Sequence, residues 1–274
     1  MSEKTHPIID LFPKEIRDKF EKGELAQQIE LPLWPEDKKA MPNELARASL
    51  FVPTARGRRK MLDKVQLAAP AGIVIEFTGI QLDMSDCDVF LLSLDYARKQ
   101  PLGTPILIKK AEFLRKLNRI ERSGKAYKNL QDQFDRLHVA KIKVTSYPRI
   151  VHIHLIDRII ENVDQGTFEI IIHPDIVSLF DNNRFCYVDW EKRLQIGTAR
   201  KDLAKWLQTY ISSHSKSKPH KVSLDKLKAW SDYEVQNIRV FRMYVREALA
   251  ELERLKIICE AGVDKQGMVT WTRL

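Results

Sequence analysis

The stretch FDRLHV at residues 134–139 recurs 118 positions later as LERLKI at residues 252–257. In both copies an apolar residue, an acid, an Arg, a Leu and a basic residue end a helical pattern. A β-branched residue then begins an apolar strand pattern. This local match predicts that the chain contains two units of the same design.

The elements predicted around the two copies have the same order. Upstream, Ile108 and Phe113 correspond to Val222 and Leu227. Two predicted elements precede the first motif. One is a strand over 73–79, and the other is a helix that begins with Ser85 and Asp88 and runs to about Lys99. The first unit is then predicted to contain a strand at 106–108, helices at 110–117 and 125–138, a hairpin over 139–145 and 150–156, and a strand at 167–172. The second is predicted to contain a helix at 201–214, a strand from Val222, a helix capped by Ser223, a helix over 237–255, and a hairpin joining 257–259 to 268–272.

Helix, strand, helix, helix and hairpin is the order of the winged-helix form of the helix-turn-helix. We therefore expect an α+β fold with two tandem winged-helix domains that form a pseudo-repeat. Residues 1–49 are polar and contain five prolines, which indicates a flexible N-terminal arm. The expected domains are the arm, a first winged helix over 50–180 and a second over 181–274, which we expect to be the main DNA-reading domain.

Positive charge is concentrated in three segments of the 274 residues. The chain carries a net charge of +9, and residues 106–149, 200–246 and 56–64 carry +8, +7 and +4. Such clusters are typical of a protein that binds a polyanion, although solvated basic helix faces give the same pattern. Because no single long basic amphipathic helix is present, a membrane surface is a less favoured partner.

Composition also indicates the compartment. The three cysteines, Cys87, Cys186 and Cys259, are scattered, which argues against disulfides and a cysteine zinc site. The first residues lack the apolar run of a secretory signal, and no run is long enough to span a bilayer. We expect a cytoplasmic protein with no membrane partner.

The helix predicted over 237–255 is the best candidate for reading DNA. Arg239, Arg242 and Arg246 are spaced by three and four residues, so they share one helix face. Arginines near the start of a recognition helix are suited to guanine edges or phosphates. Gln236 and Asn237 at the helix start are suited to adenine or phosphate. The alternative is that the three arginines are simply solvated.

Other basic residues are candidates for contacting phosphates, which position a protein without specifying sequence. In the first unit, Asp132 interrupts the outer face of the helix at 125–138, so we expect this helix to contact the DNA backbone. The candidates are Arg115, Lys116, Arg119, Arg122, Lys125 and Lys128 in the first unit, and Lys216, Lys218 and Lys221 in the second.

No catalytic, metal or cofactor site is predicted. His152 and His154 share a strand face, as in nickases that place a metal beside a tyrosine nucleophile. Those enzymes place a Tyr-x-x-Lys helix after the His pair, whereas here Tyr96 to Lys99 precedes it. Asp83, Asp86 and Asp88 cluster at a predicted helix start, where the helix dipole favours carboxylates as caps.

Several long stretches resemble plasmid replication initiators of the TrfA type. They include LPLWPEDKKAMPNELARASLFVPTARGRRK (31–60), GIQLDMSDCDVFLLSLDYAR (79–98), PLGTPILIKKAEFLRKL, FDRLHVAKIKV, DWEKRLQIGTARKDLAKWLQTYISSH and KPHKVSLDKL. The resemblance covers roughly residues 30 to 260. It implies two tandem winged helices that bind the repeated iterons of a plasmid origin and help melt adjacent AT-rich DNA.

The same resemblance implies partners. The host initiator, the replicative helicase and the sliding clamp would be recruited to the origin. A homodimer formed through the first domain would limit copy number, while the monomer opens the origin. The expected partner DNA is double-stranded.

A short segment of the expected arm looks like a clamp-binding peptide. Gln28, Ile29, Leu31 and Leu33 are similar to the six-residue peptide that bacterial proteins insert into the clamp pocket. The glutamine would bond at the pocket mouth and the leucines would fill an apolar groove. The alternative is that this stretch packs on the protein itself, since Trp34 is expected to be buried.

Three functions thus remain as hypotheses. The leading one is a non-enzymatic initiator that binds origin repeats. The second is a rolling-circle nickase, which a metal-dependent nick would support. The third is a plasmid repressor or partition protein, which would bind the same DNA without unwinding it.

Overall fold

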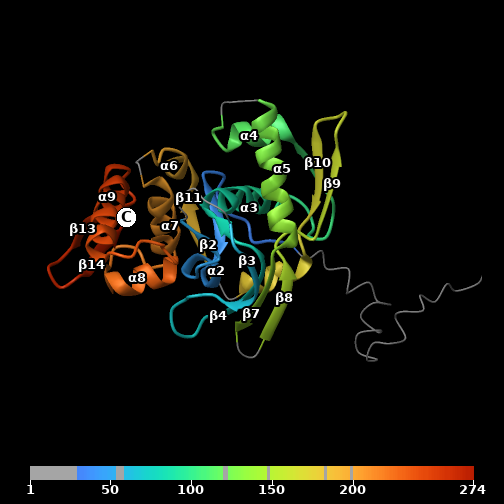
Figure 1. Ribbon diagram of the computed structural model, residues 1–274. Coiled ribbons are helices and arrows are strands. Elements are labelled where there is room, and N and C mark those ends of the chain that lie inside the picture. The colour runs from blue at the N-terminus through green and yellow to red at the C-terminus, as the bar shows by residue number, and fades with distance from the viewer. Residues whose placement is uncertain (1–29, 54–58, 120–122, 147–148, 182–183, 198–199) are drawn as a thin grey trace, which may run out of the picture.

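A computed structural model describes residues 30–274 apart from 54–58, 120–122, 147–148, 182–183 and 198–199. Two units lie side by side, with one hairpin at each end of the molecule (Figure 1). No helix in these described ranges is both long and apolar enough to cross a membrane.

The first unit has the predicted order of elements. Its helices and strands are α3 (Met84–Ala97), β6 (Ile106–Lys109), α4 (Lys110–Lys116), α5 (Gly124–Val139), β9 (Arg158–Asn162) and β10 (Thr167–Ile171). The three strands form an antiparallel sheet in the order β6-β10-β9. This is a winged helix, in which α5 takes the recognition-helix position and β9–β10 is the wing.

The second unit repeats that topology. It consists of α7 (Lys201–Ser212), β12 (Pro219–Ser223), α8 (Leu224–Ser231), α9 (Ile238–Arg254), β13 (Ile258–Val263) and β14 (Met268–Arg273). The sheet order is β12-β14-β13. In both units the first amide of the second helix donates to a glycine in the wing turn: Lys110 N to Gly166 O at 3.1 Å, and Leu224 N to Gly267 O at 2.8 Å. The predicted tandem winged-helix fold is confirmed.

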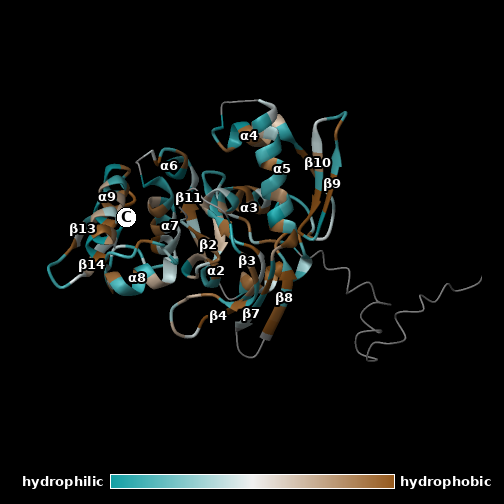
Figure 2. Ribbon diagram, in the orientation of Figure 1, coloured by the Kyte–Doolittle hydropathy of each residue, from teal (hydrophilic) through white to brown (hydrophobic). Residues whose placement is uncertain are grey.

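Capping residues and apolar spacing explain where the recognition helices form. Ser123 caps α5 by accepting a bond from the amide of Ala126, and Asn237 caps α9 by accepting one from Arg239. On α9, Phe241, Val245, Ala248, Leu249 and Leu252 recur every three or four residues and are all buried. The outer faces of α5, α8 and α9 are hydrophilic (Figure 2). Each helix therefore buries one face and presents a polar one.

The start of α3 differs from the prediction. Asp83, not Ser85, is the N-cap: its carboxylate accepts bonds from the amides of Ser85 and Asp86, and Asp86 bonds back to the Asp83 amide at 3.0 Å. The expectation that the acidic cluster caps a helix is confirmed at Asp83. The predicted helix start, with Ser85 and Asp88 as the capping pair, was wrong, because the Asp88 carboxylate forms a buried ion pair with Arg193 instead.

The hairpin predicted after α5 exists, but it is not the wing. Strands β7 (Lys141–Ser146) and β8 (Arg149–His154) pair with each other and extend a separate four-stranded sheet. That sheet has the order β3-β4-β7-β8, with β3 at Met61–Gln66 and β4 at Val74–Ile80. The wing of the first unit is the later β9–β10 pair, because only β10 pairs with β6. The first unit thus carries a hairpin that has no counterpart among the described residues of the second.

The described part of the expected arm is folded. Strand β1 (Lys38–Pro42) pairs with β11 (Phe185–Asp189), and α2 (Asn43–Arg47) follows it. Leu31 and Trp34 are 3% and 4% exposed. A flexible arm was therefore wrong for residues 30–49, because β-pairing and apolar burial outweigh the effect of the prolines. Residues 1–29 lie outside the described part of the chain.

The remaining elements join the two units. Strands β2 (Phe51–Val52) and β5 (Leu82–Asp83) form a parallel pair, and η3 (Pro174–Leu179) and α6 (Trp190–Leu194) lie between the units in the sequence. The β1–β11 pairing joins residues on either side of both expected domain boundaries, at 49/50 and 180/181. The first helices of the two units, α3 and α7, contact each other at the centre of the molecule (Figure 1).

Candidate nucleic-acid interface

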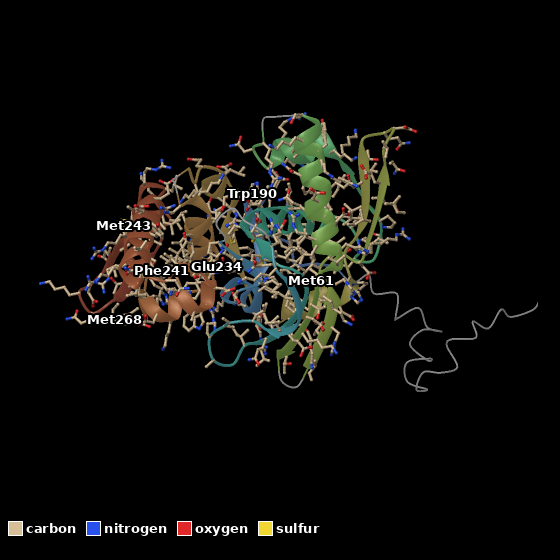
Figure 3. All side chains as sticks on the ribbon, in the orientation of Figure 1. Met61, Trp190, Glu234, Phe241, Met243 and Met268 are labelled. Atoms are coloured by element: carbon tan, nitrogen blue, oxygen red, sulfur yellow. The ribbon has the colours of Figure 1, made fainter. Side chains whose placement is uncertain are left out.

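Helix α9 presents a cationic outer face beside the second wing. Arg239 and Arg246 are exposed, and Met243 between them is 49% exposed. Figure 3 places Met243 on the outer side of α9 and Phe241, which is fully buried, on the inner side. The prediction that the arginines share one face of a partly exposed helix is confirmed.

The three arginines do not have equivalent surroundings. Arg246 donates from Nη2 to the carbonyl of Val263 at 3.0 Å, and Arg242 donates from Nη2 to the carbonyl of Lys265 at 3.4 Å. Both acceptors belong to the hairpin formed by β13 and β14. Arg242 is half-buried, and its Nε has no hydrogen-bond partner. These two arginines connect the recognition helix to the wing, whereas the Arg239 side chain makes no bond to any described residue.

The wing turn is shaped to receive Arg242. Gly267 has φ +85°, a conformation that favours glycine, and a Cβ there would lie 3.4 Å from Arg242 Nη2. Lys265 and Gln266 are exposed at the tip of this turn. Lys265 was not among the phosphate ligands predicted from the sequence. The signal was a lysine in the turn of a predicted wing, a position from which side chains reach the flanking DNA backbone.

Asn237 and Gln236 lie at the start of α9, as predicted. The Asn237 side chain is engaged, because its Oδ1 accepts the Arg239 amide at 2.9 Å as the helix cap. Gln236 is exposed, and its carbonyl lies 3.5 Å from Lys228 Nζ. Of this pair, Gln236 has the freer side chain for contact with DNA.

The lysines predicted before the second motif are exposed but lie at different places on the sheet. The amide of Ser217, between Lys216 and Lys218, bonds to the carbonyl of Arg273 at the end of β14. The wing turn is at the other end of that strand, where Ser223 pairs with Met268. The structure therefore does not bring Lys216 and Lys218 to the wing turn, while Lys221 lies mid-strand opposite Thr270.

The first-unit candidates divide into exposed and engaged groups. Arg115, Lys125 and Lys128 are exposed, and Lys128 lies 3.8 Å from Asp132. Lys116 pairs with Glu112 at 3.2 Å and lies 4.5 Å from the centre of the Tyr96 ring. Arg119 is partly buried and bonds to Gln133, and Arg122 lies outside the described residues.

The clamp-like segment is only partly described, since Gln28 and Ile29 lie outside the described residues. Leu31 is 3% exposed and packs in the core, whereas Leu33 is 79% exposed. In this conformation Leu31 is not accessible to a partner. Trp34 is buried as expected, and its Nε1 donates to Asp95 at 3.1 Å.

The histidine pair lies on β8. His152 is exposed, and His154 Nδ1 lies 3.0 Å from the carbonyl oxygen of His138. Within the described residues, no group of three or more His, Cys, Asp or Glu side chains is arranged to hold a metal. Tyr96 bonds through its hydroxyl to Glu112 at 3.2 Å. The structure gives the nickase hypothesis no assembled site in these residues.

This topology, with a cationic helix and a wing in the second unit, defines a tandem winged-helix protein. The family described as "TrfA protein" matches residues 14–271, so the chain belongs to the TrfA family. A curated relative, the plasmid replication initiator protein TrfA of Escherichia coli, is 27% identical over 241 residues, which cover 84% of this chain and 61% of that protein. The chain thus spans about three fifths of its relative's length.

Solved structures agree on the fold. The Pi initiator protein in complex with iteron DNA superposes with a TM-score of 0.56 and 15% identity, covering 87% of this chain and 97% of that one. A selenomethionine derivative of domains 2 and 3 of RctB superposes with a TM-score of 0.54 and 13% identity, covering 85% and 98%. Both pairs share the arrangement of two successive winged helices.

Proposed function

We propose that this protein is a plasmid replication initiator that binds double-stranded iteron repeats at its origin without cleaving them. It would act in the bacterial cytoplasm and help open the adjacent AT-rich DNA. Membership of the TrfA family supports this proposal, as do the likeness to an initiator solved with iteron DNA and the two winged helices. The second unit is the main reader of sequence, and the first contacts mostly the DNA backbone.

The observation that carries the proposal is the exposed face of α9 beside the wing. Arg239, in the first turn of α9, has a free guanidinium suited to a guanine edge in the major groove. Lys265 at the wing tip is suited to a flanking phosphate. Arg242 and Arg246 hold the wing against the helix, so that the two contacts are made in a fixed relation.

The first test is binding to the repeats of the plasmid's own origin, measured by footprinting. We expect Arg239→Ala to weaken binding to the iteron by about 1–3 kcal/mol and to relax preference at one base pair. Lys265→Ala should weaken binding to all sequences alike and reduce the salt dependence. Lys99→Ala is the control, because this exposed lysine follows α3 and is not among the predicted DNA contacts. An unchanged footprint in Arg239→Ala would reject α9 as the reader.

Opening of the origin is tested beside the protected repeats. Permanganate reactivity of thymines in the AT-rich segment should rise when the protein is added to supercoiled origin DNA. Binding without opening, and no support of plasmid maintenance, would favour a repressor or partition protein. A metal-dependent nick that Tyr96→Phe abolishes would favour the nickase instead.

Recruitment of the host initiator, the replicative helicase and the sliding clamp belongs to the same proposal, as does a homodimer formed through the first unit. For the clamp, the peptide must present both leucines, and Leu31 is buried here. We therefore propose that clamp binding requires residues around Leu31 to leave the core. Gln28→Ala with Leu33→Ala, which spares the buried residue, should abolish clamp capture in a pull-down and leave DNA binding intact.

A further inference from the structure

A pocket of about 580 Å³ opens between the N-terminal ends of α3 and α5 in the first unit. All but one of its lining residues are polar or charged, and they come from four separate segments of the chain. The lining includes Arg59, Ser85, Arg119, Lys125, Asn129 and Gln133. Because α5 is in the recognition-helix position, this pocket lies beside the part of the first unit that would approach DNA.

Carboxylates already neutralise two of the three guanidinium groups that line the pocket. Arg136 pairs with Asp86 at 2.7 Å, and Arg59 pairs with Asp86 at 3.1 Å and with Asp83. The Asp86 side chain is fully buried beneath them. These three ion pairs form a fixed wall of the pocket and leave little net charge there.

Arg119 is different. It donates to Gln133 Oε1 at 2.6 Å and to Ser85 Oγ at 2.9 Å, both neutral acceptors, and forms no ion pair with any residue that the structure describes. Burial lowers the pKa of Arg119, although the more distant charges of Asp88, Asp86 and Asp83 oppose the shift. A partly buried guanidinium with neutral partners and unused N–H donors is strongly stabilised by an anion.

The corresponding helix of the second unit carries carboxylates where the first unit has amides. With the offset of 118 residues, Gln133 corresponds to Glu251 and Asn129 to Glu247. Glu251 accepts the amide of Gly197 at 3.0 Å and pairs with Arg254 at 2.8 Å, and these bonds lower its pKa to about 2. Glu247 lies 3.9 Å from Arg200.

The two carboxylates of the second unit are thus replaced by amides in the first. An amide has no charge to pair with Arg119 or to repel an incoming anion. Lys125, exposed in the first turn of α5, adds a further positive charge at the mouth of the pocket. Asp132 also lines the pocket, and its carboxylate pairs with Lys128 at 3.8 Å. The Arg119 guanidinium, Lys125 and the positive end of the α5 dipole are thus left without a carboxylate bonded to them among the described residues.

We propose that this pocket binds one phosphate group of a nucleic acid, held by Arg119 and Lys125, and that its source is the DNA backbone beside α5. The inference rests on the proposed function, which it deepens by giving the first unit an anchor point. A phosphate seated there fixes the position of the first unit on the duplex while the second unit reads bases.

The decisive variant is Asn129→Glu, which restores the carboxylate that the second unit has at this position. Asn129 is exposed, so the variant should fold, as thermal unfolding will verify. In a salt titration of binding to origin DNA, the slope of log K against log salt should fall by about 0.9, the value of one phosphate contact. Gln131→Glu adds the same charge to α5 outside the pocket and should retain more of the slope.

Single methylphosphonate substitutions then locate the phosphate. Removing the charge of one particular DNA phosphate should weaken binding of the unmodified protein. The same substitution should have no effect on binding of the Asn129→Glu variant. The pocket inference is overturned if Asn129→Glu and Gln131→Glu show the same salt-dependence slope and no single DNA phosphate has this effect. If the protein still protects its iterons in a footprint, the proposed function stands. If the unmodified protein does not footprint iterons at all, the proposed function itself fails.

A second arm tests a free nucleotide as the source of the phosphate. Binding of ATP and of inorganic phosphate is followed by ³¹P NMR with the full chain. Weak binding of both, at millimolar concentration, is expected for a site built for a backbone phosphate. Micromolar ATP binding that Asn129→Glu removes, with no methylphosphonate effect, would overturn the backbone as the source. Arg119→Lys should weaken either ligand, since an ammonium lacks the planar fork of the guanidinium.

Discussion

At the residue scale, side chains of one type have different roles because their partners differ. Arg239 is exposed and free, Arg246 bonds to a wing carbonyl, and Arg119 faces a pocket. Spacing in the sequence correctly placed Arg239, Arg242 and Arg246 on one face. It gave no information on which of them bonds to the wing, because that depends on a hairpin that follows in the chain.

His214 provides a residue-scale prediction of pH dependence. Burial lowers the pKa of His214 to about 4, and Arg47, His220 and Arg273 also surround it. The folded protein therefore binds the proton less readily than the unfolded chain, whose histidines have a pKa near 6.5. Stability present above pH 6.5 should decrease as the pH falls towards 4, by about 2 kcal/mol at pH 5 from this residue.

The measurement is urea unfolding at pH 7 and pH 5. His214→Gln keeps a side-chain donor for the carbonyl of Tyr210, which lies 2.9 Å from His214 Nδ1, but does not titrate. The variant should lose clearly less stability between the two pH values than the unmodified protein. Equal losses in both proteins would show that other groups account for the acid sensitivity.

At the element scale, short-range patterns predicted helices well and strand partners poorly. Helices α4, α5, α8 and α9 lie within one or two residues of their predicted bounds, because caps and apolar spacing are local signals. The first wing was assigned to the wrong hairpin, because choosing between β8 and β9 requires knowing that β10 pairs with β6. Register and partner choice depend on tertiary contacts that one sequence does not display.

The wing contacts lead to an element-scale prediction. Removing the guanidinium in Arg246→Ala deletes the bond to the carbonyl of Val263, so the β13–β14 hairpin should open more often. Hydrogen exchange of amides over 260–270 should accelerate several-fold, while exchange in the buried face of α9 stays the same. Arg239→Ala, on the same helix face but without a wing contact, should leave this exchange unchanged. If both variants behave alike, Arg246 does not position the wing.

The candidate DNA interface, like the helices and strands, was predictable from the sequence only in part. Charge clustering and the helix motif indicated α9 and the basic residues of the first unit, and most of these side chains are exposed as expected. The pocket around Arg119 was not foreseen as a pocket. It assembles side chains from Arg59 to Arg136, whose proximity depends on the packing of α3 against α5.

At the scale of the whole molecule, a buried ionic cluster joins the two units. Asp88 of α3 pairs with Arg193 of α6 at 2.5 Å and with Lys205 of α7 at 2.5 Å. Arg193 is fully buried and also donates to Gln208 and Thr209 of α7. Burial alone would raise the pKa of Asp88, but the charges of Arg193 and Lys205 outweigh it and lower the pKa. A buried charge network thus links α3 of the first unit to α7 of the second.

This network gives a prediction about cooperativity between the units. Asp88→Asn leaves Arg193 buried without its counter-charge, so the free energy of unfolding should fall by about 3–5 kcal/mol. Because the lost ion pair lies between the two units, the second unit should separate from the first before either unit unfolds. Urea unfolding should then show two transitions, with tryptophan fluorescence, to which Trp190 of α6 contributes, changing before the circular dichroism signal.

The matched control is the ion pair between Lys60 and Glu234, which also joins the two units but is 55% and 53% exposed. Solvent screens such a pair, so Glu234→Gln should leave both stability and cooperativity nearly unchanged. A single, equally stable transition in Asp88→Asn would show that apolar packing and the β1–β11 pairing alone hold the units together. In that case the spacing of the two DNA-binding surfaces would not depend on buried charge.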